Sequence, residues 1–289
     1  MDYIMECKNV TYTYPLVDKP ALKDINLNIE KGKVYGVIGE NGAGKTTLCE
    51  VLRGFAPSFF KGERTGEVIY DGKPLEEYGA EISAHIGFVF QNPFTQISGV
   101  KDTVFEEVAY GLENFGYSEE EIERRVVEVM KTTNIEELAM KNPFEISGGQ
   151  MQRVALASVI VLEPDVLIID EPTSQLDPQG SEGVFEIIKA MKEKQKTIIL
   201  VEHKIDLIAE YCDEVIAVKD GCIISKGPTQ DVLSDISLLE KGVNLPQAAI
   251  LGSKLKEKGL KLDYIPITEK QAVEVISKAL KGVNNYGRY

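Results

Sequence analysis

Apolar and polar positions follow two different periods along this chain. They alternate through residues 4–14 and 22–29, which predicts two antiparallel strands. Short apolar runs typical of buried strands recur at residues 34–38, 67–70, 86–90, 166–170, 197–202, 214–218 and 222–225. Helical patterns lie between these runs, so the sequence predicts an α/β fold, a mostly parallel sheet covered by helices, with an antiparallel β flank.

The middle of the chain has a helical pattern only. From residue 103 to 138 apolar side chains recur at helical spacing, and Val104, Val108 and Leu112 share one face. Ser118 followed by Glu121 predicts a capping box at the start of a second helix. Because no strand pattern returns until residue 166, we expect an α-helical subdomain at about 92–160, inserted into the sheet-based domain.

The pattern changes again after Gly227-Pro228. Short helical stretches follow, separated by glycines and a proline. A further capping box, at Thr268 and Gln271, begins the last of them. We therefore expect two parts, a larger domain at 1–228 and a small α-rich C-terminal appendage at 229–289.

Composition restricts where we expect to find the protein. Hydrophobic residues make up 43% of the chain and charged residues 27%, as in globular proteins. No apolar run approaches the roughly 20 residues that span a bilayer. The acidic start at residues 1–6 lacks the basic residues of a signal peptide. We therefore expect the protein to be in the cytoplasm.

Charge and cysteine content argue against nucleic-acid binding and against a structural zinc site. The formal net charge of −14 opposes binding to DNA or RNA, which requires a basic surface. The four cysteines show no C-x-x-C spacing and the chain has only two histidines, so we expect no structural zinc site.

Residues 39–46, Gly-Glu-Asn-Gly-Ala-Gly-Lys-Thr, carry the clearest chemical signal. They lie between the apolar run at 34–38 and a helix-compatible segment at 47–52, the strand–loop–helix context that a phosphate-binding loop requires. Glycines let backbone N–H groups face an anion, and the helix N-terminus adds positive potential. Lys45 offers a charge to the β- and γ-phosphates, and the Thr46 hydroxyl can bind Mg²⁺. The alternative is a glycine-rich turn that binds nothing.

Two further segments have polar chemistry. Residues 146–150, Ile-Ser-Gly-Gly-Gln, predict a second helix N-terminus whose N–H groups and Ser147 hydroxyl suit an anion. The apolar run at 166–170 ends in adjacent carboxylates, Asp170 and Glu171, which suit Mg²⁺ binding and the activation of water. Taken alone, the first could be an ordinary helix start and the second a cap or a solvated pair.

Together and in this order, the segments resemble the motifs of ATP-binding-cassette (ABC) ATPases, with Ile146 in place of the usual leucine of LSGGQ. The resemblance covers residues 3–227 and implies the P-loop NTPase fold in its ABC-ATPase form, with ATP and Mg²⁺ as cofactors. It implies that Asp170 holds Mg²⁺ through water and that Glu171 is the general base. The phosphate-loop residues that it assigns to nucleotide binding are Gly39, Asn41, Gly42, Ala43, Gly44, Lys45, Thr46 and Thr47.

The resemblance also gives roles to residues that are ambiguous alone. Gln91 would link Mg²⁺ and water to a membrane partner, and His203 would sense the γ-phosphate as part of the catalytic set. Tyr14 would stack on adenine, although Tyr12, two residues earlier, is a second candidate for this role. The alternative is that Tyr14 is an ordinary tyrosine of a strand. The residues that would close over ATP held by a second ABC ATPase subunit, identical or related, are Ser147, Gly148, Gly149 and Gln150, and those that would contact that subunit are Ser174 and Asp177.

Two segments indicate which type of ABC ATPase the chain resembles. Residues 90–97 and 104–116 resemble the energy-coupling factor (ECF) ATPases, with Phe94-Thr95 replacing the usual Asp-Asn and Leu112 replacing proline. This implies an importer of a vitamin or a transition-metal ion, with two ATPases on a transmembrane scaffold and a separate substrate-capture membrane subunit. The chain would then lie at the cell membrane, peripheral on its cytoplasmic side.

Other functions share the core motifs. The chain could serve another ABC importer or an exporter, or it could be a soluble ABC ATPase of DNA repair or translation. The soluble class usually carries a long coiled-coil insertion or two cassettes, and this sequence has neither. The appendage resembles the region by which ECF ATPases pair, and the alternative is a tail that only covers the core.

Overall fold

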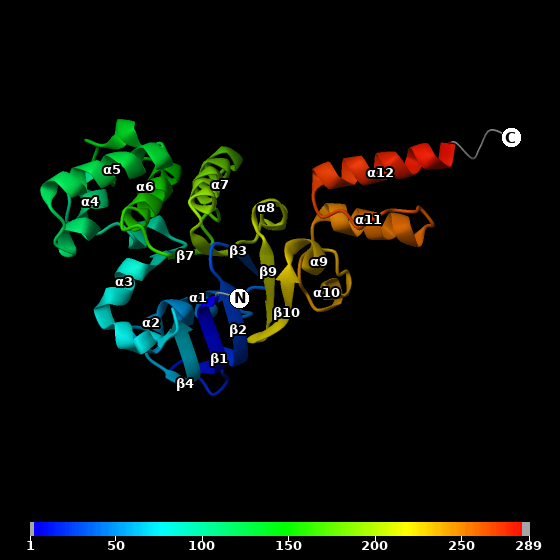
Figure 1. The fold of residues 1–289 in the computed structure, drawn as a ribbon, viewed down its shortest axis with the longest axis horizontal. Helices are drawn as coiled ribbons and strands as arrows, with labels where there is room; N and C mark the ends of the chain where they lie inside the picture. The colour runs from blue at the N-terminus through cyan, green and yellow to red at the C-terminus, as the bar shows by residue number, and fades with distance from the viewer. Residues whose placement is uncertain (1–2, 285–289) are drawn as a thin grey trace.

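A computed structural model describes residues 3–284 of the chain. Residues 1 and 2 of the expected larger domain and residues 285–289 of the expected appendage lie outside this range. The fold has two sheets, a helical part and a C-terminal helical pair, arranged along one long axis (Figure 1).

The central sheet has six strands, in the order β10-β9-β3-β8-β7-β6. Its strands are β3 (Val34–Ile38), β6 (Ile86–Val89), β7 (Val166–Asp170), β8 (Thr197–Val201), β9 (Glu214–Lys219) and β10 (Cys222–Pro228). The pairs β3–β8, β3–β9, β6–β7 and β7–β8 are parallel, and only β9–β10 is antiparallel among them. The predicted mostly parallel α/β sheet is confirmed.

The antiparallel flank is a second sheet with the order β2-β1-β4-β5. It consists of β1 (Tyr3–Thr13), β2 (Leu22–Glu30), β4 (Glu63–Tyr70) and β5 (Lys73–Pro74). The expected start of β4 at residue 67 is wrong, because its first residues carry few apolar side chains. Their backbone nevertheless pairs with β1, Glu63 opposite Thr13 and Thr65 opposite Thr11. A ladder of backbone hydrogen bonds requires no hydrophobic pattern.

Strand β3 shows how the two hydrophobic cores are divided. Its side chains alternate between the faces of the central sheet, as strand geometry dictates. Tyr35 and Val37 pack into the cluster shared with the antiparallel sheet, and Val34 and Ile38 pack into the cluster on the helical side. All four are buried, so β3 runs through the interior and delivers its C-terminal loop to a defined place.

Helices cover the central sheet and connect its strands. Those within the sheet-based part are α1 (Lys45–Arg53), α2 (Phe55–Ser58), α3 (Ile82–His85), α7 (Pro178–Glu193) and α8 (Ile205–Tyr211), with 3₁₀ turns η1 (Leu75–Glu81) and η2 (Pro93–Thr95). Helix α1 contacts β6, β7 and β8, and its side chains Leu48 and Leu52 are fully buried. Packing on three strands fixes the direction of its N-terminus.

A helical region lies between β6 and β7, as expected. It contains α4 (Val104–Asn114), α5 (Glu119–Thr133), η3 (Glu136–Leu138) and α6 (Gly148–Ile160), at one end of the molecule in Figure 1. The predicted box at Ser118 is only half made, because Ser118 accepts from the Glu121 N–H without a return bond. A complete box begins α4, at Thr103 and Glu106. Its T-x-x-E spacing is present in the sequence.

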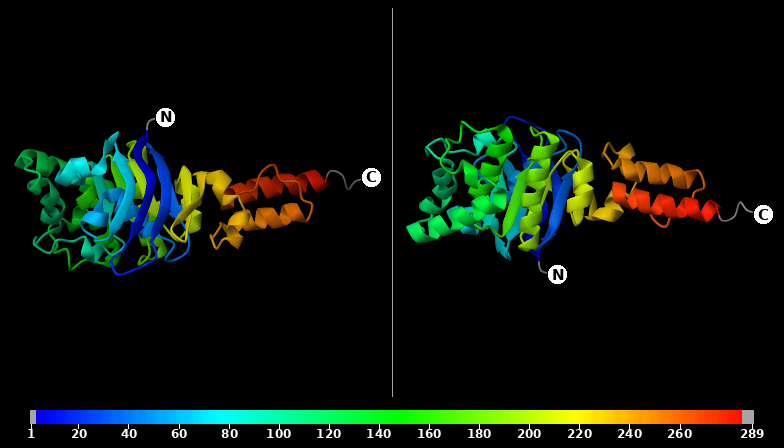
Figure 2. Two further views of the ribbon diagram at one scale, coloured as in Figure 1. Left: turned by 90° about the horizontal axis from the view of Figure 1, so that it is seen from below. Right: turned by 90° about the horizontal axis from the view of Figure 1, so that it is seen from above.

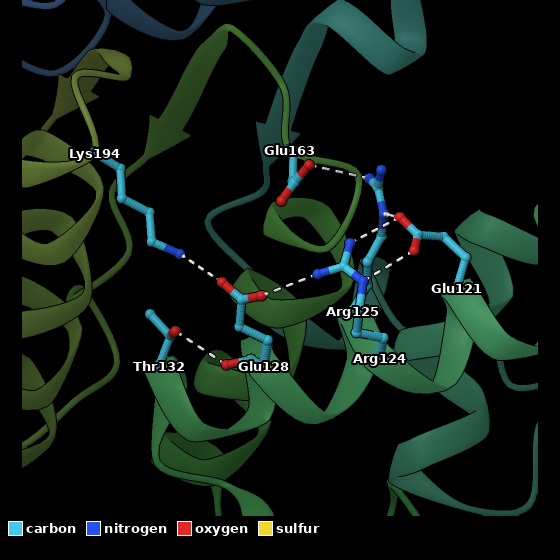
Figure 3. Close-up of polar contacts among 7 residues, drawn as sticks. All are labelled: Glu121, Arg124, Arg125, Glu128, Thr132, Glu163 and Lys194. Carbon is cyan, nitrogen blue, oxygen red and sulfur yellow. Dashed lines mark hydrogen bonds and ion pairs between the residues drawn. The ribbon is translucent and has the colours of Figure 1, made fainter.

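Ion pairs join this helical region to the sheet-based part (Figure 3). Arg125 of α5 lies 3.2 Å from Glu163, which precedes β7, and Glu128 lies 3.2 Å from Lys194, which follows α7. A cavity of about 220 Å³ adjoins them, with apolar walls that include Met191. None of its lining residues is a predicted site residue, so this cavity is separate from the expected chemistry.

Between β10 and residue 284, the regular elements are all helices. These are α9 (Thr229–Leu233), α10 (Ser237–Glu240), α11 (Gln247–Glu257) and α12 (Glu269–Asn284). Helices α11 and α12 lie side by side and extend away from the sheets (Figure 2). The predicted box at Thr268 and Gln271 is present, because each residue's side chain accepts a bond from the other's backbone N–H. Within residues 3–284, no helix has the length and apolar character needed to cross a membrane.

Candidate nucleotide-binding site

The loop between β3 and α1 is shaped by its glycines. Gly44 is the N-cap of α1 with φ 105°, and no side chain caps the helix, so the first N–H groups remain available to an anion. Gly39 has φ 149°, and a Cβ there would lie 2.2 Å from the carbonyl oxygen of Val218. Glycine is therefore required at both positions by backbone conformation and by close approach.

Lys45 is held across this loop. Its Nζ donates to the carbonyl oxygens of Gly39 and Glu40, each at 3.0 Å, and the residue is only 5% exposed. Burial lowers the pKa of Lys45, and the carboxylates of Glu171 and Asp170 oppose that effect. An ammonium in this position can attract the phosphates of a nucleotide.

A cavity of about 600 Å³ opens over the loop, a size within the range of ligand sites. Its lining residues are Tyr14, Ala21, Asn41, Gly42, Gly44, Lys45, Thr46, Thr47, Gln91, Glu171 and His203. The structure thus brings together predicted residues from five separate stretches of the sequence. Gly39 and Ala43, also predicted, do not line the cavity: Gly39 holds Lys45, and Ala43 is buried with its carbonyl accepting from Gly221.

The carboxylate of Glu171 is held between two predicted partners. Gln91 Nε2 donates to Glu171 Oε2 at 2.7 Å, and His203 Nε2 lies 2.8 Å from Glu171 Oε1. Glu171 has φ 46°, a left-handed conformation that is unfavourable for a side chain of this size. Strain of this kind costs about 1–3 kcal/mol and is concentrated at functional sites. Two side chains thus hold the Glu171 carboxylate, a hydrogen-bond acceptor, at the wall of the cavity.

Asp170 provides the fit for Mg²⁺. Its Oδ1 is buried and has no hydrogen-bond partner among the described residues. Burial raises the pKa of Asp170 to about 6, while a hydrogen bond with the Thr46 side chain lowers it. A buried carboxylate oxygen beside a hydroxyl is the hard oxygen donor set that Mg²⁺ prefers, with substrate phosphates as further ligands. Gln91 directs its amide nitrogen at Glu171, so only its oxygen could serve a metal.

Tyr14 and Tyr12 have different surroundings. The Tyr12 ring is fully buried, and its hydroxyl donates to the carbonyl oxygens of Phe60 and Lys61. Tyr14 lines the cavity and packs edge-on against Tyr12, with ring centroids 4.9 Å apart. Of the two, only Tyr14 is placed to meet a bound base.

Sequence reasoning missed Glu50. This residue of α1 is 8% exposed, and its Oε2 accepts the Tyr14 hydroxyl at 2.7 Å. The only signal in the sequence was a carboxylate one helical turn after Thr47, on a face otherwise expected to be buried.

The Ser147–Gln150 segment lies elsewhere. It lines a second cavity of about 820 Å³, which it shares with Gln175, Leu176 and Asp177 and not with the phosphate loop. Ser147 and Gln150 form a capping box that begins α6, and Asp177 caps α7 by accepting from the Gly180 N–H. Ser174 is exposed, and its N–H lies 3.3 Å from the carbonyl oxygen of Glu171.

A phosphate loop, paired carboxylates at a strand end and a second glycine-rich helix start on a separate surface define an ATP-binding cassette. The ABC transporter family model matches residues 22–174. The chain therefore belongs to the ABC transporter family of ATP-binding proteins, which hydrolyse ATP.

Curated relatives match over nearly the whole chain. A putative ABC transporter ATP-binding protein of Pyrococcus abyssi is 38% identical, over 96% of this chain and 99% of its own. An energy-coupling factor transporter ATP-binding protein, EcfA2, of Streptococcus agalactiae is also 38% identical, over 94% of this chain and 98% of its own. The recognition of an ABC ATPase resembling the ECF type is thereby confirmed.

Solved structures agree. The cbiO1 protein of Clostridium perfringens, described as part of the ABC transporter complex cbiONQ, has a TM-score of 0.73 and 36% identity and covers 83% of this chain and 94% of its own. The ATP-binding cassette MJ0796, solved as a dimer with ADP and phosphate, has a TM-score of 0.68 and 31% identity, over 78% of this chain and 98% of its own. These matches confirm the predicted ABC-ATPase fold.

Proposed function

We propose that the chain is the ATP-binding and ATP-hydrolysing subunit of an ECF-type ABC importer, which powers uptake of a vitamin or a transition-metal ion through membrane partner subunits. The observation that carries the ATPase part is the separation of two half-sites. The phosphate loop and Glu171 line one cavity, while Ser147–Gln150 and Asp177 of the same chain line another. Two chains placed head to tail would complete each site.

The chemistry follows from the placed residues. Lys45 and the open N-terminus of α1 would bind the phosphates, and Tyr14 would stack on adenine. Glu171, whose carboxylate is held in position by Gln91 and His203, would take a proton from the attacking water. Asp170, Thr46 and Gln91 would hold Mg²⁺, which when bound neutralises charge on the phosphate oxygens.

The second subunit would supply the remaining contacts. Backbone N–H groups of Gly148 and Gly149, with Ser147 and Gln150, would approach the γ-phosphate from that subunit, and Ser174 and Asp177 would lie at the contact. The nucleotide would hold the two chains together, and hydrolysis would remove the charge that did so. The partner would be an identical chain or a related ATPase, and α11 and α12 would add to the pairing.

Two observations support the importer type. The streptococcal relatives are named as energy-coupling factor transporter ATP-binding proteins. In this chain, η2 directly follows Gln91 and exposes 55% of Phe94, which would place an apolar contact for a transmembrane scaffold next to the catalytic glutamine. The protein would then be peripheral on the cytoplasmic side of the cell membrane, with ATP and Mg²⁺ as cofactors. A different ABC importer or exporter is the alternative.

The variant Glu171→Gln tests both parts of the proposal. Without the base, we expect turnover to fall by about 10²–10⁴-fold and a nucleotide-bound dimer to accumulate with Mg-ATP, measured by ATPase assay and by light scattering after size exclusion. Full hydrolysis by the variant, or a wild-type rate per chain that does not depend on protein concentration, would refute the half-site arrangement. The same trapped dimer, used as bait in detergent-solubilised membranes, should retain multi-span membrane proteins. A soluble ABC ATPase would retain none.

A further inference from the structure

Glu50 is a buried carboxylate without a cationic partner. No ion pair among residues 3–284 includes it, although it is only 8% exposed. A buried charge without compensation is costly, so its one hydrogen-bond donor is important to it. That donor is the Tyr14 hydroxyl, at 2.7 Å. Burial raises the pKa of Glu50, and the hydrogen bond from Tyr14 opposes the rise.

The hydrogen bonds around Tyr14 have a direction. Tyr14 donates its single hydroxyl proton to the Oε2 atom of Glu50. The contact between Tyr14 and Thr47, at 3.0 Å, must then be donated by the Thr47 hydroxyl. The resulting chain, Thr47 to Tyr14 to Glu50, ties the residue that directly follows β1 to two successive turns of α1.

The Tyr14 ring is therefore restrained at both ends. Its hydroxyl is bound to α1, and its ring rests edge-on against Tyr12, which is itself buried and bound through its own hydroxyl. The ring can change orientation only by breaking these contacts. A side chain ordered before a ligand arrives avoids a loss of entropy on binding.

We propose that Glu50 is a positioning residue for the adenine platform: by holding the Tyr14 hydroxyl it fixes the stacking ring at the cavity and raises affinity for the base of the nucleotide, with no effect on the phosphate contacts. This inference rests on the proposed function, in which Tyr14 stacks on adenine. It predicts that two parts of α1 act on different parts of the nucleotide. The N-terminus of the helix binds phosphate, and its second turn orders the base-binding side chain.

The experiment compares ATP with inorganic tripolyphosphate, which has the phosphates and no base, by calorimetric titration of the full chain. For Glu50→Ala, we expect the Kd for ATP to rise by about three- to tenfold, as expected for an added rotamer-ordering cost. The Kd for tripolyphosphate should stay unchanged, and KM for ATP should rise without a matching fall in kcat. Glu50→Gln, which still accepts a hydrogen bond, should bind ATP nearly as the wild type does.

Tyr14→Phe removes the same hydrogen bond from the other side and keeps a stacking ring, which guards against a folding defect in Glu50→Ala. Its ATP affinity should fall by a similar factor, and the double variant should bind no more weakly than either single variant. Additive losses, an unchanged Kd for ATP in both single variants, or an equal weakening of tripolyphosphate would overturn the positioning role. If the wild type itself binds ATP no more tightly than tripolyphosphate, it is the base-stacking role of Tyr14 in the proposed function that fails.

Discussion

The two glycine-rich helix starts of this chain look alike in the sequence, and the structure treats them differently. At α1, Gly44 is the N-cap in a left-handed conformation and no side chain binds the first N–H groups. At α6, Ser147 and Gln150 bind each other's backbone N–H groups in a capping box. The first helix start is open to a ligand within its own chain. The second is already ordered, and it holds its serine in a fixed orientation.

Their surroundings differ in the same sense. The start of α1, with Lys45, lines one cavity together with Glu171 and His203, so the groups proposed to bind and to hydrolyse ATP lie together. The cavity at the start of α6 includes Arg153 and Glu182, but none of the carboxylates that line it is held by a glutamine and a histidine as Glu171 is. Since Ser147 Oγ accepts from the Gln150 N–H, its own proton is free to be donated outward. The comparison supports the proposal of one half-site for the chain's own nucleotide and one complementary surface for a partner's nucleotide.

The largest effect that would separate the two helix starts comes from Gly44→Ala and its matched partner Gly148→Ala. A Cβ at Gly44 would require φ 105° and would lie 2.8 Å from the Ala21 carbonyl oxygen, whereas a Cβ at Gly148 meets no atom of its own chain within 4 Å. We expect Gly44→Ala to weaken ATP binding by about 10–100-fold, because the substitution adds backbone strain of roughly 1–3 kcal/mol to the loop conformation that binds the phosphates. Titration calorimetry measures this directly.

For Gly148→Ala, thermal stability and ATP binding to the single chain should stay at wild-type levels. Turnover should fall, because the added methyl group would point at the second subunit. Wild-type turnover in Gly148→Ala would contradict the assignment of this surface to the partner's nucleotide.

Ser147→Ala should lower turnover without weakening ATP binding to the single chain. A hydrogen bond to a charged phosphate contributes about 1.5–3 kcal/mol, so kcat should fall by roughly 10–100-fold. The Kd for ATP at low protein concentration should not change, because Ser147 does not line the phosphate-loop cavity. Ser147→Thr retains both the hydroxyl and the cap and is the matched control. Equal loss of kcat in both variants would indicate a general disturbance of α6 instead of a lost contact.

The last prediction concerns the stability of the fold, through Asp170 in the absence of Mg²⁺. Its folded-state pKa is raised from 3.8 to about 6 by burial, so the native state binds the proton more tightly than the unfolded state does. The associated stability is present below pH 3.8 and is lost as the pH rises through 6. Asp170→Asn should therefore be more stable than wild type at pH 8, by up to about 3 kcal/mol, and should lose this advantage near pH 4. Thermal unfolding in EDTA at the two pH values measures it. An advantage of equal size at both would contradict the ionisation argument.

Local features of this protein could be predicted because their causes lie within a few residues. The phosphate loop depends on the spacing of its glycines and Lys45, and the strands β3 and β7 on short apolar runs. The start of β4 could not be predicted, because it forms by backbone pairing with β1 and not by a hydrophobic pattern. The Ser118 box was overpredicted because matching residue types do not ensure that both bonds form.

The sequence by itself determined the chemistry of this protein: which carboxylates end β7, which residues form the phosphate loop and which segment begins α6 with glycines. Only the tertiary structure decided which of these groups meet. It brought Gln91 and His203 to the same carboxylate, that of Glu171, which is 80 and 32 residues away from them in the chain. It also placed Glu50 within hydrogen-bond distance of the Tyr14 hydroxyl. The physical reason is the distance along the chain over which each kind of interaction acts. Turn geometry and hydrophobic periodicity act over a few residues, whereas contacts between distant segments depend on the packing of both sheets around α1.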